Sequence, residues 1–267
     1  MPGEDGSLLA GPLTRGPWDH SVQHGGSVVG LLGRACEQAG ARSDQRVSRL
    51  TVEFLGPVPV ARLRAEAEIV RPGRRVQLVD GRLWADGPDG PRVVARASCQ
   101  WVAYDEDRPT GEFGPVPPRP DTASDPDSGE VAYPRPGFNC DAVELRPIEG
   151  NTEEPGPGLI WVRLRHPLVA GEATTPFQQA ATISDLGIAV GWDHSPAGYP
   201  LINCDVTVQL SRYPIGEWLL LRSRLVRAND GVAFAETELS DDHGHIGWVL
   251  QSLVENPAAG EMFAAPK

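Results

Sequence analysis

Apolar and polar residues alternate along several segments of the chain, and this pattern predicts β-strands. In the segment Val47–Leu55, apolar Leu50, Val52 and Phe54 alternate with polar neighbours, which is the two-residue period of a half-buried strand. Pro-Gly and Asp-Gly pairs lie between several such segments and indicate tight turns. The other predicted strands are Leu63–Arg71, Val76–Ala85, Arg92–Tyr104, Cys140–Leu145, Leu159–Leu164, Leu201–Ser211, Gly216–Arg227, Val232–Leu239 and Ile246–Glu255.

Two segments have the spacing of helices instead. After His24-Gly25-Gly26, apolar residues at positions 28, 29, 31, 32 and 35 predict a helix that Gly40 ends. The segment Pro176–Asp193 predicts a second, largely apolar helix with one carboxylate, Asp185, in its middle. An ionised group in apolar surroundings is costly unless it is paired or hydrogen-bonded. Asp185 therefore either faces water or has a function.

The two halves of the chain follow the same plan. At a constant offset of 156 residues, Thr51 falls on Thr207, Leu63 on Leu219 and Val76 on Val232, which indicates an internal repeat. A helix followed by long strands is the layout of a hotdog unit. We therefore predict an α+β fold, a double hotdog in which two antiparallel sheets each wrap a central helix, with residues 1–104 forming the first unit and 138–267 the second.

Residues 105–137 break the pattern of strands. They are dense in proline and acidic residues, and they are long for a connection inside one compact unit. We expect this segment to be a linker that lies over the surface between the two units.

Composition narrows the possible functions of the chain. A net charge of -12 disfavours general nucleic-acid binding, and no run approaches the 18 apolar residues of a membrane span. The four cysteines are far apart and the N-terminus shows no secretory signal, so free thiols in the cytoplasm are expected. The bias toward arginine, alanine, glycine and proline is typical of a GC-rich bacterial genome. No nucleotide-binding, zinc-spaced or serine-hydrolase motif is present, so neither a cofactor nor a metal is expected.

Several segments resemble one family. Three segments of the second half resemble the bacterial type II acyl-CoA thioesterases and their actinobacterial thioesterase-like relatives. They are SDLGIAV in the second predicted helix, INCDVTVQLSRYPIGEWLLL after it and GWVLQSLVEN in the last strand. HGGSVVGLLGRA resembles the start of the first helix in that family. The resemblance implies hydrolysis of acyl-CoA thioesters in lipid metabolism, by a water held between side chains and without a metal or redox cofactor. It also implies a monomer or a homodimer.

The resemblance assigns three catalytic residues. The helix aspartate corresponds to Asp185, the strand position that is often threonine in the family corresponds to Asn203, and the glutamine of the last strand corresponds to Gln251. Thioester hydrolysis needs a positioned water, a group that takes its proton and donors for the developing oxyanion, and these side chains can supply such groups. His24, Gly25 and Gly26 are expected to bind the substrate through a close approach of the helix start.

Each of these residues also has a purely structural interpretation. Asp185 could face solvent, Gln251 could make a structural hydrogen bond, and His24-Gly25-Gly26 could be a plain entry into a helix. Asn203 shares its predicted strand face with Asp205 and Thr207, which is the pattern of a polar outer face.

Two other functions stay open at this point. Asp19 and His24 have the spacing of the acid–base pair of hotdog enoyl-CoA hydratases, although the accompanying Asn-Pro is absent. A catalytically silent acyl-CoA or lipid-binding protein is the alternative from another class. Two groups of arginines could contact the phosphates of CoA or be solvated charges: Arg71, Arg74 and Arg75, and Arg222, Arg224 and Arg227.

Overall fold

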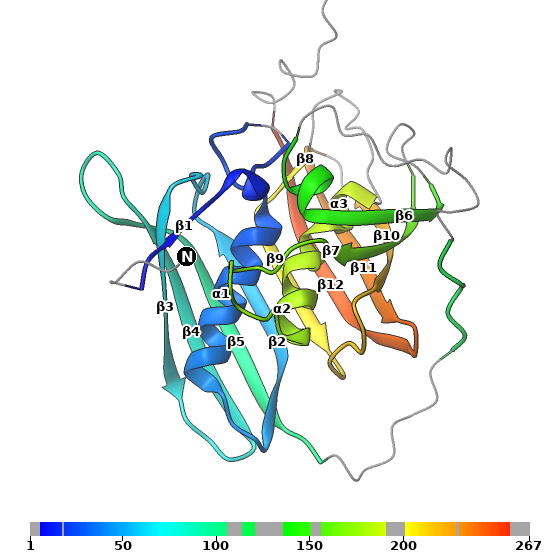
Figure 1. Ribbon diagram of the computed structural model, residues 1–267, viewed down its shortest axis with the longest axis horizontal. Helices are drawn as coiled ribbons and strands as arrows, with labels where there is room; N and C mark the ends of the chain where they lie inside the picture. Colours follow the sequence, from blue (N-terminus) through cyan, green and yellow to red (C-terminus); the bar gives the residue numbers. More distant parts are fainter. Residues whose placement is uncertain are drawn as a thin grey trace, which may run out of the picture.

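One antiparallel sheet runs through both halves of the chain in the computed structural model (Figure 1). The structure describes residues 6–17, 19–105, 114–120, 136–150, 156–190, 201–227 and 230–256. The strand order in the sheet is β1-β3-β4-β5-β2-β9-β12-β11-β10-β7-β6, and β8 also pairs with β12. The strands are β1 (Leu8–Leu9), β2 (Gln45–Phe54), β3 (Arg62–Arg71), β4 (Val76–Ala85), β5 (Arg92–Ala103), β6 (Val143–Glu149), β7 (Gly158–Leu164), β8 (Leu201–Asn203), β9 (Asp205–Leu210), β10 (Leu219–Arg227), β11 (Val232–Asp241) and β12 (Gly244–Glu255).

The two halves join where β2 pairs with β9. Thr51 lies directly opposite Thr207, and their hydroxyl oxygens are 3.1 Å apart. These two residues are equivalent at the offset of 156, so a local twofold axis passes between them. Outward from this join the order is β2, β5, β4 and β3 in one half and β9, β12, β11 and β10 in the other. The predicted double hotdog is confirmed, and its two sheets are joined into one continuous sheet.

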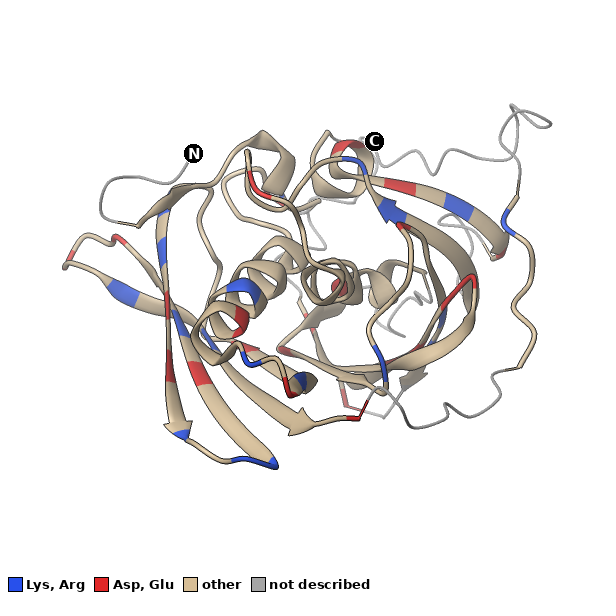
Figure 2. Cartoon of the chain, turned by 60° about the horizontal axis from the view of Figure 1, so that its bottom comes forward, with Lys and Arg blue, Asp and Glu red and all other residues tan. Residues whose placement is uncertain are grey.

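The helices lie at the centre of the molecule, between the curved half-sheets (Figure 2). The first is α1 (Gly25–Gly40). The second predicted helix is three consecutive pieces: α2 (Pro176–Ile183), the 3-10 turn η3 (Ser184–Leu186) and α3 (Gly187–Val190). Its last predicted residues, 191–193, lie outside the described residues. No helix in the described part of the chain is long and apolar enough to cross a membrane.

Glycines let α1 and α2 pack closely against each other. A Cβ atom on Gly26 would lie 2.5 Å from the carbonyl oxygen of Thr182, and one on Gly30 would lie 2.1 Å from the Thr182 hydroxyl. Both distances are far below van der Waals contact. The small residues on α1 therefore set how near α2, and the turn η3 that follows it, can come to the start of α1.

Two short turns lie beside the start of α1. These are the 3-10 turn η1 (Pro12–Thr14) and the π-helical turn η2 (Phe138–Ala142). The strand predicted from Cys140 is therefore wrong for its first three residues, and β6 begins at Val143. The Asp141 carboxylate accepts a hydrogen bond of 2.8 Å from the Gly137 N–H, and this local bond stabilises a turn in place of an extended strand.

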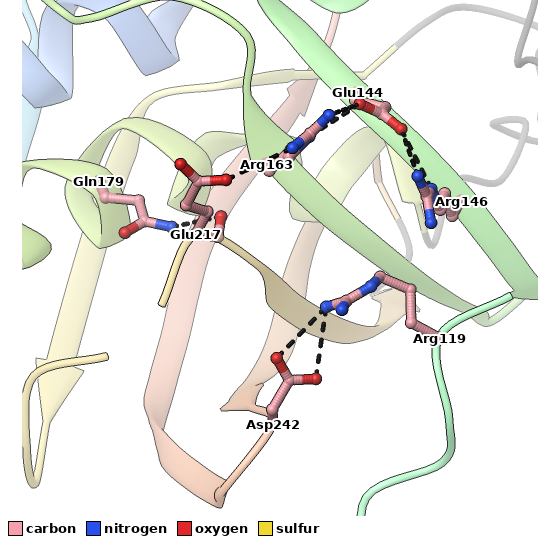
Figure 3. A network of polar contacts seen from close by, with 7 residues as sticks. All are labelled: Arg119, Glu144, Arg146, Arg163, Gln179, Glu217 and Asp242. Carbon is pink, nitrogen blue, oxygen red and sulfur yellow. Dashed lines mark hydrogen bonds and ion pairs between the residues drawn. The ribbon is translucent and has the colours of Figure 1, made fainter. Parts of the chain in front are cut away.

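Part of the predicted linker lies on the outer face of the second half-sheet. We call residues 114–120 the strap (Figure 3). Val116 of the strap packs against an apolar cluster. The Arg119 guanidinium lies over the rings of Trp161 and Trp218, 5.5 and 4.8 Å from their centroids, and forms an ion pair with Asp242 at 3.3 Å. Residues 106–113 and 121–135 lie outside the described residues. The cluster under Val116 consists of Leu159, Trp161, Trp218 and Leu220.

Candidate active site

Asp185 lies in the 3-10 turn η3 and is almost fully buried, with 3% of its surface exposed. Burial penalises the charged form and raises the pKa of its carboxyl to about 7, while hydrogen bonds from Asn203 and from the Gly26 N–H act in the opposite direction. The interpretation of Asp185 as a solvent-facing helix residue is therefore wrong. Instead, a buried carboxylic acid sits here with a pKa close to neutral pH.

Asn203 reaches this carboxylate because the strand that carries it is interrupted. The predicted strand 201–211 is divided into β8 and β9 at Cys204. Asn203 pairs with Leu253 of β12, whereas Thr207 pairs with Leu250, so the register shifts by one residue between them. Such a shift turns a side chain to the other face of the sheet. Asn203 therefore faces inward and its Nδ2 donates to Asp185 Oδ1; its predicted place on the polar outer face is wrong.

Gln251 comes from the inner face of β12 and is 1% exposed. Its Nε2 donates to Asp185 Oδ1 over 3.1 Å. Its Oε1 is buried and has no hydrogen-bond partner among the described residues. A buried acceptor without a partner costs free energy, so this oxygen is suited to bind a water or a polar group of a ligand.

The first turn of α1 closes the other side of the site. A Cβ atom on Gly25 would lie 2.6 Å from Asp185 Oδ2, so only glycine allows the carboxylate so close to the helix start. His24 caps α1, because its Nδ1 accepts the Gly26 N–H over 3.0 Å. The same Nδ1 lies 3.1 Å from Asp185 Oδ2. The positive end of the α1 dipole also favours a carboxylate in this position.

All six residues proposed from the sequence thus lie in one cluster, although the two halves of the chain contribute different members. Asp185, Asn203 and Gln251 come from the second half, and His24, Gly25 and Gly26 from the first. The sequence did not indicate Phe138 of η2, whose ring stacks on the His24 imidazole with centroids 4.4 Å apart and planes 14° apart. A lone phenylalanine after a proline-rich segment carries no signal that could have revealed this role.

The spacing of Asp19 and His24 does not correspond to a pair in the structure. The Asp19 carboxylate is exposed and accepts hydrogen bonds of 2.8 Å from the N–H and the hydroxyl of Ser21, while His24 contacts Asp185. The acid–base pair of a hotdog hydratase is therefore not formed by these residues.

The side-chain groups gathered at the site are one carboxylate, two amides and the imidazole of His24. Within the described ranges, no group of three or more histidine, cysteine, aspartate or glutamate side chains is placed to hold a metal ion. Of the arginines considered for CoA phosphates, Arg74 and Arg75 lie between β3 and β4, and the others lie on β3 and β10. Arg222 and Arg224 pair with Glu238 and Glu236.

Comparison with protein families gives two matches that follow the two halves. The acyl-CoA thioesterase N-terminal domain matches residues 14–100, and the acyl-CoA thioesterase C-terminal domain matches residues 114–254. The second match begins at the first residue of the strap. No curated protein sequence matches the chain.

Solved structures share the fold over most of their length. A candidate thioesterase II from Thermobifida fusca YX is 16% identical, with a TM-score of 0.72 over 94% of this chain and 91% of that chain. A hot dog protein of unknown function from Alicyclobacillus acidocaldarius is 20% identical, with a TM-score of 0.70 over 94% and 92% of the two chains. The acyl-CoA thioesterase II TesB2 from Mycobacterium marinum is 16% identical, with a TM-score of 0.63 over 87% and 89%.

Proposed function

The chain belongs to the acyl-CoA thioesterase family and is an acyl-CoA thioesterase, and we propose that it hydrolyses its substrate with a water held by Asp185, Asn203 and Gln251. The observation that carries this proposal is the convergence of two amide donors on one oxygen of a buried carboxylate. Both amide side chains project from the inner face of the sheet, and the carboxylate comes from the turn that ends the central helix.

The role of each residue follows from its position. Asp185 takes a proton from the water, and the resulting hydroxide adds to the thioester carbonyl carbon. The tetrahedral intermediate collapses, the carbon–sulfur bond breaks, and the departing thiolate takes the proton back from Asp185. The products are the free acid and CoA, and the atoms balance without another reactant.

The two amides orient the carboxylate and the water. Each uses one N–H to hold Asp185 Oδ1 and keeps a second N–H and a carbonyl oxygen that can bind the water. Asn203 stands where the resembled family often has threonine, and its amide supplies the donor that a hydroxyl would supply there. The N-terminus of α1 is suited to stabilise the negative charge that develops on the carbonyl oxygen.

Asp185→Asn is the most direct test of this mechanism. Asparagine nearly keeps the shape of the side chain but cannot take a proton, so thiol release from acyl-CoA should fall by about 10²- to 10⁴-fold, the usual effect of losing a general base. The assay is thiol release on a panel of acyl-CoAs of different chain length.

Asp80→Asn is the matched control, because it makes the same chemical change on β4, away from the site. It should leave turnover unchanged. An Asp185→Asn protein with wild-type turnover would refute the proposed base. Tight acyl-CoA binding without turnover by the parent protein would favour the silent binding protein instead.

A further inference from the structure

The contact between His24 and Asp185 joins the two halves inside the site, and the inference drawn from it rests on the proposed function. His24 precedes α1 and is 7% exposed, and Asp185 follows α2 and is 3% exposed. Their Nδ1 and Oδ2 atoms are 3.1 Å apart, which is hydrogen-bonding distance. The water-holding mechanism above gives His24 no role.

The orientation of the imidazole is fixed from two sides. The Gly26 N–H donates to Nδ1, and the ring of Phe138 stacks on one face of the imidazole. A neutral imidazole has one nitrogen that carries hydrogen and one that accepts. Because a backbone N–H can only donate, Nδ1 is the accepting nitrogen and Nε2 carries the hydrogen.

This tautomer determines which protonation state of Asp185 can form a hydrogen bond with His24. The Gly26 N–H lies against both Nδ1 and the Asp185 carboxyl. The single lone pair of Nδ1 would face the charge of an ionised Oδ2. It would accept the O–H of a protonated Oδ2, while the Gly26 N–H stays with the carboxyl oxygens. Burial lowers the pKa of His24 to about 3 and raises the pKa of Asp185 to about 7. A proton that enters the pair near neutral pH therefore resides on the carboxyl and points at Nδ1.

No other charged group among the described residues contributes to the pKa of either member of the pair. The groups that contact the pair are the two amides, the Gly26 N–H and the ring of Phe138, and none of them titrates in this range. The titratable groups on the adjoining turn and strand are Cys140 and Asp141 on η2, Cys204 between β8 and β9, and Asp205 on β9.

We propose that His24 is a positioning residue for hydrolysis, whose Nδ1 accepts the hydrogen bond of Asp185 once Asp185 has taken the proton from the attacking water. The proton stays on Oδ2, directed at Nδ1, until the thiolate sulfur takes it back. His24 keeps its Nε2 hydrogen throughout and is neither oxidised nor charged. Its effect is to stabilise the protonated carboxyl, which makes Asp185 a stronger base.

The test compares pH profiles of kcat/KM for the wild type, His24→Phe and His24→Asn. Phenylalanine keeps a flat ring that can stack on Phe138 but removes the acceptor. The acid limb of the profile should therefore move to lower pH by about one unit, and the plateau of kcat/KM should fall by about tenfold. A hydrogen bond to one protonation state is worth about that factor. Asparagine can cap the helix and accept through its oxygen, so it should restore most of the wild-type profile. His166→Phe, at an exposed position, is the control for the substitution itself.

Two further measurements do not depend on turnover, and the second, on the wild type, does not depend on whether His24→Phe folds. Difference infrared spectroscopy, with Asp185→Asn for assignment, should show the titration of the Asp185 carboxyl move to lower pH in His24→Phe. Nitrogen NMR of the wild type should show His24 with Nε2 protonated and Nδ1 accepting. An unshifted acid limb with an unshifted carboxyl titration, or a His24 with Nδ1 protonated and Nε2 bare at every pH, would overturn the proposal. If the protein hydrolyses no thioester, the proposed function fails and the two spectra still decide the role of His24.

Discussion

At the scale of single residues, Asp185 destabilises the fold when it is ionised. Its pKa is about 7 in the folded protein and has its ordinary value, near 4, in the unfolded chain. The unfolded state therefore ionises more readily, and the stability that a neutral carboxyl contributes is fully present below pH 4 and is lost as the pH rises through 7.

Asp185→Asn should therefore stabilise the protein at pH 8 by a few kcal/mol, since a tenfold difference in proton affinity is worth about 1.4 kcal/mol. The gain should shrink toward pH 4, where wild-type Asp185 is neutral in both states. Chemical denaturation of both proteins at several pH values measures this difference, with Asp80→Asn as the control. A difference that is zero at every pH would show that the carboxylate is better solvated than its burial indicates.

The six residues proposed from the sequence lie together in the structure, but the direction in which Asn203 points could not be read from the sequence. Asp185 stood out as a carboxylate among apolar residues, and Gln251 as a polar residue on an apolar strand face. Asn203 fell on the wrong face because a one-residue register shift at Cys204 turns it inward, and such a shift leaves no mark in the alternation of the residues before and after it. The stacking of Phe138 on His24 depends on long-range packing and was equally invisible.

At the scale of elements, the distance between α1 and α2 is set by residues without side chains. Gly30→Ala would place a methyl carbon only 2.1 Å from the Thr182 hydroxyl oxygen, which is far inside van der Waals contact. The Thr182 hydroxyl donates to the Gln178 carbonyl within α2, so it cannot move without losing that bond. We expect Gly30→Ala to lower stability by about 1–3 kcal/mol through overpacking.

A double-mutant cycle separates this clash from other effects. Thr182→Ala removes the hydroxyl and should by itself be tolerated better than Gly30→Ala, and the pair Gly30→Ala with Thr182→Ala should regain most of the lost stability. Thermal unfolding of the four proteins measures the coupling. Additive effects would mean that the helices relax apart rather than collide at this point.

The strap shows what composition can and cannot reveal about a linker. Its proline content predicted a surface segment, and residues 114–120 do run over the surface. The sequence did not show that Arg119 lies over the rings of Trp161 and Trp218. The two tryptophans are 57 residues apart (161 to 218) and meet only when β7 pairs with β10.

Arg119→Ala should lower the stability of the protein by about 1–2 kcal/mol, since partly desolvated contacts between a guanidinium and an aromatic ring are worth about that much. Arg75→Ala, at an exposed position between β3 and β4, should change stability by less than about 0.5 kcal/mol. The measurement is the free energy of unfolding in denaturant. Equal values for both variants would show that the strap does not contribute to the stability of the sheet.

At the scale of the whole molecule, the internal repeat explains the architecture but not why the two halves contribute different residues to the proposed site. The constant offset predicted two equivalent halves, and the pairing of Thr51 with Thr207 places their axis at the join. The two helix starts nevertheless differ: α1 receives Asp185, whereas α2 receives Glu37, whose carboxylate accepts hydrogen bonds from Thr175 at 2.9 Å and from Gln178 at 2.7 Å. Which half would supply the proposed base could not follow from a symmetric repeat.

Because His24 and Gly26 come from one half and Asp185 from the other, the site exists only when the halves are paired. A chain cut at a protease site introduced within residues 121–135 should keep nearly full thiol-release activity, since the β2–β9 join and the strap still hold the halves together. Each half produced alone should be inactive, and mixing or co-producing them should restore activity that Asp185→Asn in the second half abolishes. Activity in an isolated second half would contradict a site shared by both halves. Loss of activity on cutting alone would show that the covalent connection, and not the continuous sheet, holds the two halves in register.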